Sequence, residues 1–112
     1  MALITGGTQT ATISTKHQLY TTSTDGVYAL GVDTSAMALG DVLELYAEAD
    51  FESGGTNRQV LFATYAHVQA DPGKVSIPVI APYGVTFHLK QTAGTGRAFP
   101  WFVASEIGRA HV

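Results

Sequence analysis

The stretch VTFHLKQT, residues 85–92, decides the fold class, because apolar and polar residues alternate in it one by one. Every second residue from Val85 to Leu89 is apolar, and the residues between them are Thr and His. A period of two indicates a β-strand with one buried and one solvated face, whereas a helix repeats about every 3.6 residues. We therefore expect a strand over residues 84–92.

Similar runs fill the rest of the chain, and turn signals of Gly, Pro and Asp separate them about every 10 to 20 residues. The expected strands are residues 9–15, 17–22, 26–33, 41–49, 58–70, 74–80, 84–92 and 97–106, with a bend or bulge around residues 63–64. One helical turn is expected over residues 34–39, with Thr34 as its N-cap, Met37 pointing inward and Gly40 at its end.

About eight short strands in a chain of 112 residues predict a single all-β domain, either an antiparallel β-sandwich or a small barrel. We favour the sandwich, with a jelly-roll-like topology. The sandwich domain is expected over residues 9–107. Residues 1–8 are expected to form a flexible N-terminal arm, and residues 108–112 a C-terminal tail.

The composition argues against several classes of partner. Charged residues make up 13% of the chain, against about 25% in a typical soluble protein, and the net charge of −3 does not suit nucleic-acid binding. The chain has no cysteine, so disulfides and thiolate metal sites are excluded. No run approaches the roughly 18 apolar residues of a membrane helix, and no signal peptide is recognisable. We expect neither a nucleic-acid nor a membrane partner, and synthesis in a cytoplasm.

The residues that carry chemistry form no recognised catalytic or metal-binding motif. His67 and His88 fall on the polar sides of different strands, so a metal site would require them to meet beside Asp50 or Asp71. Solvated surface histidines are the simpler interpretation. No serine lies in a GxSxG elbow, although distant residues can assemble a triad. We predict no catalytic residue, no cofactor, no metal and no small-molecule ligand.

Aromatic residues suggest two contact surfaces. Tyr46 and Tyr65 fall on the polar sides of their strands, where they would form a sugar platform, a protein-facing patch or two separate exposed tyrosines. The last strand is apolar on both sides, with Trp101 on one side and Phe102 on the other. Such a strand is either central in its sheet or covered by a partner.

Three segments of the chain resemble small virion proteins of tailed bacteriophages: TDGVYAL at residues 24–30, LGDVLEL at 39–45 and GVTFHLKQTAGTGR at 84–97. Several of these short, cysteine-free, β-rich proteins are decoration (cement) proteins of the capsid. The resemblance implies a non-enzymatic structural protein on the virion surface that binds the major capsid protein, stabilises the icosahedral shell by bridging its subunits, and forms a homo-oligomer.

The residues expected to contact a partner come from the first strand, the last strand and the tyrosine pair. They are Gln9, Ala11, Ile13, Tyr46, Tyr65 and Phe102. The alternative function is a phage tail or fibre domain that binds host glycan through the two tyrosines. A third hypothesis is a small β-barrel enzyme that uses His67 or His88.

Overall fold

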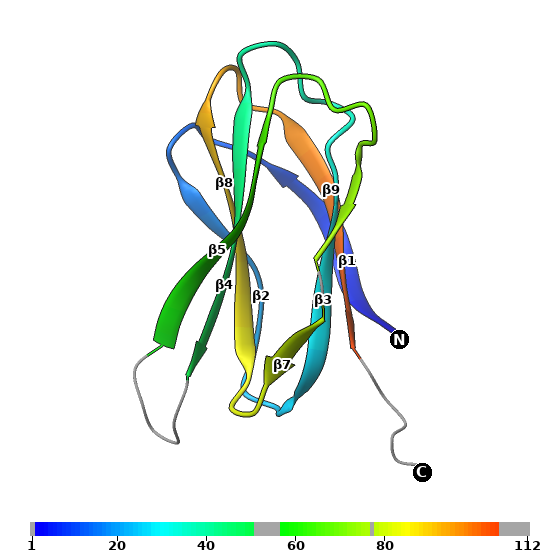
Figure 1. The fold of residues 1–112 in the computed structure, drawn as a ribbon, viewed down its shortest axis with the longest axis vertical. Coiled ribbons are helices and arrows are strands. Elements are labelled where there is room, and N and C mark those ends of the chain that lie inside the picture. Colours follow the sequence, from blue (N-terminus) through cyan, green and yellow to red (C-terminus); the bar gives the residue numbers. More distant parts are fainter. Residues whose placement is uncertain (1, 51–56, 77, 106–112) are drawn as a thin grey trace.

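The computed structural model describes residues 2–50, 57–76 and 78–105, and these ranges form nine β-strands and no helix. The strands are β1 (Ala2–Thr10), β2 (Lys16–Thr22), β3 (Gly26–Asp33), β4 (Val42–Asp50), β5 (Asn57–Ala66), β6 (Gly73–Val75), β7 (Val79–Ala81), β8 (Val85–Ala93) and β9 (Ala98–Ser105). They form two sheets that face each other (Figure 1). Sheet A has the order β1-β9-β3-β6, with β7 also paired to β3, and sheet B has the order β2-β8-β4-β5.

The strand order is that of a jelly roll. The pairs β1–β9, β2–β8, β3–β6/β7 and β4–β5 nest inside one another, like the two arms of one long hairpin whose tip lies between β4 and β5. Successive pairs lie in opposite sheets, and the contacts β9–β3 and β8–β4 complete the two sheets. All these pairings are antiparallel, which confirms the expected single-domain antiparallel sandwich.

The core lies between the sheets and is made by the inward side chains of the central strands. Phe87 and Leu89 of β8 meet Leu30 of β3 and Phe99 of β9, and all four side chains are fully buried. As predicted from the alternation in residues 85–92, the apolar side chains of this stretch face the core. Truncating a buried Phe to Ala costs about 3–5 kcal/mol, so these side chains dominate the stability of the sandwich.

The prediction of a flexible N-terminal arm over residues 1–8 is wrong for residues 2–8, which the structure describes. β1 begins at Ala2 and pairs with β9 along its length, while the expected strand over 9–15 gives way after Thr10 to a turn. The physical reason lies in Gly6 and Gly7, which look like a loop in the sequence. Gly6 lies opposite Phe102 and Gly7 opposite Trp101, and a Cβ on Gly6 would approach the Trp101 carbonyl oxygen to 2.7 Å. The glycines thus allow close approach to bulky neighbours.

The helical turn expected over residues 34–39 is also wrong. Two successive tight turns replace it, closed by bonds from Met37 N to Thr34 O and from Asp41 N to Ala38 O, both 3.0 Å. The Thr34 hydroxyl donates to the carbonyl of Pro72 at 2.8 Å instead of capping a helix. Met37 is buried as predicted, and Gly40 has a positive φ of 94°.

Two further boundaries differ from the prediction. The strand expected over 58–70 ends at Ala66, because His67 adopts a positive φ of 65°. The expected strand over 74–80 is divided into β6 and β7, and Pro78, which has no N–H to donate, precedes β7. The predicted tail at 108–112 lies outside the described residues.

Within the part of the chain that the structure describes, there is no helix long and apolar enough to cross a membrane.

Candidate functional site

The outward side of sheet A carries apolar side chains on every strand, with Thr8 and Asp33 as polar residues toward one end, and we call its apolar part the apolar face. Residues paired directly across a sheet share one side. One row of pairs runs Gly6–Phe102–Gly31–Val75, a second runs Leu3–Ala104–Ala29, and Val27 pairs with Ile80. The apolar face thus consists of Leu3, Gly6, Val27, Ala29, Gly31, Val75, Ile80, Phe102 and Ala104.

Large side chains on the apolar face remain open to solvent. Leu3 is 70% exposed, Val75 64% and Ile80 78%, while Phe102 at the centre is 39% exposed. Phe102 keeps this intermediate exposure because its ring lies over Gly31, where a Cβ would collide with the ring. An apolar surface spread across the strands of a sheet, rather than scattered single residues, is typical of a contact surface.

Charge is nearly absent from sheet A. Its described strands carry only Asp33 and Lys74. Lys74 pairs with the inward-facing Val32, and its ammonium lies 4.9 Å from the centroid of the Tyr65 ring. Asp33 ends β3, and the Ser35 N–H that it accepts at 2.9 Å lowers the pKa of its carboxyl. The centre of the apolar face can therefore be covered without burying an ion.

The outward side of sheet B is polar, and we call it the charged face. Lys16 donates to Glu48 at 2.5 Å and also to Gln59, and His88 Nε2 lies 3.4 Å from the same Glu48 oxygen. The hydroxyl of Tyr46 donates to another carboxylate of this face. The charged face consists of Lys16, Gln18, Thr21, Glu44, Tyr46, Glu48, Gln59, Thr64, Thr86, His88 and Lys90.

These contacts change the proton affinities on the charged face. The bond from Lys16 lowers the pKa of Glu48, although burial opposes it. Burial lowers the pKa of His88, and the Glu48 carboxylate only partly offsets this effect. The bond to the Glu44 carboxylate, with burial, raises the pKa of Tyr46. Glu44 and Glu48 thus each have a partner on the charged face, whereas neither ring nitrogen of His88 has a hydrogen-bond partner among the described residues.

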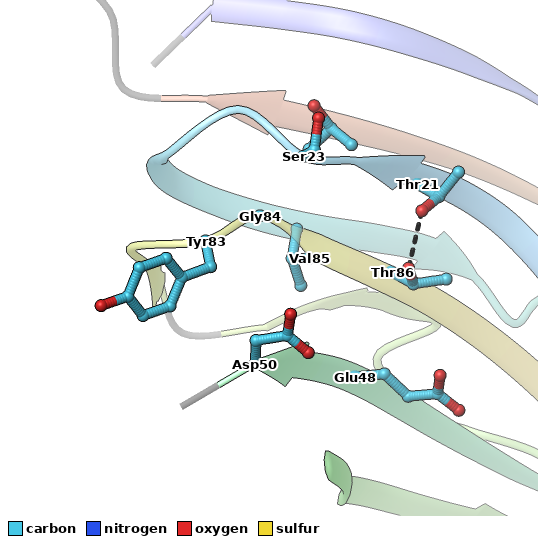
Figure 2. A pocket seen from close by; sticks show the side chains of 9 residues that line it. Thr21, Ser23, Glu48, Asp50, Tyr83, Gly84, Val85 and Thr86 are labelled. Atoms are coloured by element: carbon cyan, nitrogen blue, oxygen red, sulfur yellow. Dashed lines mark hydrogen bonds between the residues drawn. The ribbon is translucent and has the colours of Figure 1, made fainter. Parts of the chain in front are cut away.

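A polar pocket of about 580 Å³ lies at one end of sheet B (Figure 2). Glu48 and Asp50 of β4 lie on one side of it, and Thr21 and Ser23 lie on the other, with Tyr83 at the rim. One carboxylate oxygen of Asp50 is buried without a hydrogen-bond partner among the described residues. Hydroxyls, carboxylates and an aromatic rim are groups that can bind a polyhydroxylated ligand.

A buried carboxylate at the opposite end joins two loops of the sandwich. Asp41 is 1% exposed and accepts hydrogen bonds from Ala38 N at 2.9 Å, Thr95 N at 3.1 Å and Arg97 Nε at 2.8 Å. Burial alone would raise the pKa of Asp41, but these donors together lower it. Sequence reasoning missed this residue, because its partner Arg97 is 56 positions away.

The expected contact residues of the first strand do not form one surface. Gln9 is half-buried and its side-chain amide lies 3.2 Å from His17 Nδ1. Ala11 belongs to the core, and its N–H donates to Arg97 O at 2.8 Å. Ile13 lies in the turn that leads to β2. Of the expected contact residues, Phe102 is the one at the centre of the apolar face.

The tyrosine platform is not formed. Tyr46 lies on the charged face but is only 8% exposed. Tyr65 pairs with the inward-facing Leu43 and packs against the core. The two rings therefore lie on opposite sides of sheet B.

The two candidate histidines are also separate. His88 lies on the charged face, whereas His67 Nδ1 accepts the N–H of Gly40 at 2.9 Å in a loop. Among the described residues, no group of three or more His, Asp or Glu side chains is placed to hold a metal ion.

Comparison with protein-family models, with curated proteins and with solved structures finds no match to this chain. What the chain binds has to be inferred from its own surfaces.

Proposed function

We propose that this chain is a decoration (cement) protein of a tailed-bacteriophage capsid, which binds the outer surface of the icosahedral shell and stabilises it by bridging major capsid subunits. The observation that carries the proposal is the contrast between the apolar face and the charged face. A protein that coats a shell needs one surface for the shell and another that stays in water. The apolar face suits the first task, and the charged face suits the second.

The chemistry of the apolar face supports a protein partner. Phe102 is a partly exposed aromatic anchor, and the open side chains of Leu3, Val75 and Ile80 extend the apolar surface on the strands on both sides of it, while Ala29 and Ala104 are buried. An aromatic side chain surrounded by flat apolar surface is typical of the centre of a protein interface. The resemblance of residues 24–30, 39–45 and 84–97 to small phage virion proteins points to the capsid as that partner.

Binding to reconstituted shells tests the proposal. Shells assembled from the major capsid protein of the same genome, mixed with the purified chain, should carry it into the pellet on sedimentation. Phe102→Asp should weaken binding by about 30-fold or more, because a central aromatic anchor contributes about 2 kcal/mol or more. Thermal unfolding of each variant is measured in parallel to show that it is folded.

Gln18→Asp is the matched control, because it makes the same substitution to Asp at an exposed position of the charged face. Its binding should stay within about twofold of the wild type. A wild-type chain that remains in the supernatant would contradict the proposal. A loss of binding in Gln18→Asp but not in Phe102→Asp would assign the shell contact to the charged face and would contradict the role given to the apolar face.

A second candidate function is recognition of host glycan by a tail or fibre domain, favoured by the polar pocket rather than by the tyrosine pair. Sugar hydroxyls would bond to Asp50 and Ser23, and Tyr83, 41% exposed, would stack on a sugar ring. Titration with host surface polysaccharide should then shift the amide resonances of Gly84 and Val85. Antibody labelling of purified virions separates the two candidates, since shell labelling supports decoration and tail-tip labelling supports glycan recognition.

A further inference from the structure

The first strand is the least protected edge of the two sheets. Exposed edges present unpaired N–H and C=O groups, and proteins usually guard them with charges, prolines or short strands. β2 carries Lys16, β5 carries Arg58, and β6 and β7 have three residues each with Pro78 between them. β1 has nine residues with neither a charge nor a proline. A bulge interrupts it between Leu3 and Thr5, so residues 5–10 form its regular part.

The direction of the β1 amides follows from one hydrogen bond at the end of the strand and from the alternation of an antiparallel ladder. Ala11 N donates to Arg97 O at 2.8 Å, and these two residues continue the register that pairs Thr10 with Ala98. Hydrogen-bonded and non-bonded pairs alternate along such a ladder. Gly7 and Gln9 therefore direct their N–H groups toward β9, whereas Gly6 and Thr8 direct theirs away from it, toward the open edge.

We propose that β1 pairs with β1 of a second copy of this chain, antiparallel about a twofold axis at Thr8. This inference goes beyond the proposed function and does not depend on it. In the described part of the chain β1 pairs only with β9, so its outer edge is available. The pairing joins the two copies of sheet A into one continuous sheet (Figure 1 shows β1 beside β9).

The side chains of β1 fit a second copy better than a charged partner. With the axis at Thr8, each Thr8 lies opposite Thr8 of the second copy, and Gly6 lies opposite Thr10. Paired threonines are favourable cross-strand neighbours, and no like charges meet because the strand has none. The Thr10 carbonyl already accepts Gln9 Nε2 at 2.9 Å, so the bonds at Thr8 carry most of the pairing.

The assembly also doubles the apolar face. The two copies of Leu3, Thr8 and Phe102 lie on one side of the joined sheet, because directly paired residues share a side. A symmetric pair of apolar faces presents the same surface twice, as a protein that contacts two neighbouring subunits requires.

The test is the oligomeric state of the purified full chain, measured by sedimentation equilibrium over a wide concentration range without any shell. The wild type should form a dimer. Thr8→Pro removes the N–H at the axis from both copies and should raise the dimer Kd by about tenfold or more. Thr8→Val is the matched control, since it keeps the N–H and a β-branched side chain, and its Kd should stay within about threefold.

Hydrogen exchange of the wild type covers the case in which Thr8→Pro fails to fold. The Gly6 and Thr8 amides should be protected at high concentration and exchange quickly on dilution, while the Gly7 and Gln9 amides stay protected throughout. A monomer at every concentration, or a dimer with freely exchanging Gly6 and Thr8 amides, would overturn the proposal. If the chain is monomeric alone and the Gly6 and Thr8 amides are protected only on shells, the edge of β1 pairs with a strand of the capsid protein instead of a second copy. Shell binding by such a monomer would leave the proposed function standing.

Discussion

The two outer faces of the sandwich both belong to antiparallel strands, but they differ in whether the outward residues are polar or apolar. On sheet B, residues 85–92 alternate as a half-buried strand should, with Phe87 in the core and His88 and Lys90 outside. On sheet A, β3 and β9 are apolar in both phases: Leu30 faces the core, and Ala29 points to the outward side although it is itself only 4% exposed. A strand apolar on both sides ordinarily needs cover on both sides. A strand that fails to alternate on an exposed face therefore predicts a contact surface there.

The exposed side chains of the two outer faces are expected to contribute less to the stability of the fold than the buried Asp41. Asp41→Ala should lower the free energy of unfolding by about 3 kcal/mol, because it leaves the N–H groups of Ala38 and Thr95 without their acceptor. Gln18→Ala on the charged face and Val75→Thr on the apolar face should each stay within about 0.5 kcal/mol. Urea denaturation monitored by circular dichroism measures all three. A comparable loss in Val75→Thr would show that the apolar face is part of the folding core.

The second prediction concerns how the apolar face is kept flat. Gly31→Ala should lower the free energy of unfolding by about 1–3 kcal/mol, because its Cβ collides with the Phe102 ring. Gly73→Ala is the matched control on β6 of the same sheet, where a Cβ meets nothing within 4 Å, and it should be neutral or slightly stabilising. The Phe102 ring resonances should shift in Gly31→Ala alone. Equal stabilities of the two variants would mean that the ring does not rest on Gly31.

Most of the strands could be predicted because alternation and turn residues are local signals. β1 could not, since Gly6 and Gly7 have low strand propensity and become a strand only through pairing with β9, about 95 positions later in the chain. The helical turn failed for a similar reason, because the Thr34 hydroxyl finds an acceptor at Pro72, which the local sequence does not reveal.

The tyrosine platform failed because of a single extra residue in β5. Leu45 pairs with Ala63, but Tyr46 pairs with Leu61, so Phe62 is a bulge that reverses the inside and outside phase of the strand. A bend or bulge around residues 63–64 was predicted, yet the side that Tyr65 faces follows only from the register of β5 with β4. The apolar face was foreseeable in part from Phe102, whereas Leu3, Val75 and Ile80 join it only through long-range pairing.

The third prediction tests whether the charged face stabilises the fold through its own contacts. Glu48→Gln should lower the free energy of unfolding at neutral pH by about 0.5–1 kcal/mol, because Lys16 loses its ionic partner. The folded pKa of Glu48 is below its ordinary value of 4.5, so this contribution is present above pH 4.5 and is lost as the pH falls through the folded pKa. Denaturation at neutral and at strongly acidic pH measures the difference between wild type and variant. A difference that persists unchanged in acid would contradict the ionic explanation.

The smallest expected effect is a difference between the two faces in how strongly the free energy of unfolding depends on pH. Burial lowers the pKa of His88 below its ordinary value of 6.5, so the unfolded chain binds a proton more readily than the folded one. Its contribution to stability is therefore present above pH 6.5 and is lost as the pH falls through the folded pKa, with a slope of at most about 1.4 kcal/mol per pH unit. His88→Gln should remove this part of the slope, while Val75→Thr keeps it, because the centre of the apolar face has no group that titrates there. Chemical denaturation at closely spaced pH values below 6.5 measures both variants. If His88→Gln retained the wild-type slope of the free energy of unfolding against pH, the acid sensitivity would come from groups outside the charged face. The two faces would then differ in polarity but not in how they couple stability to protonation.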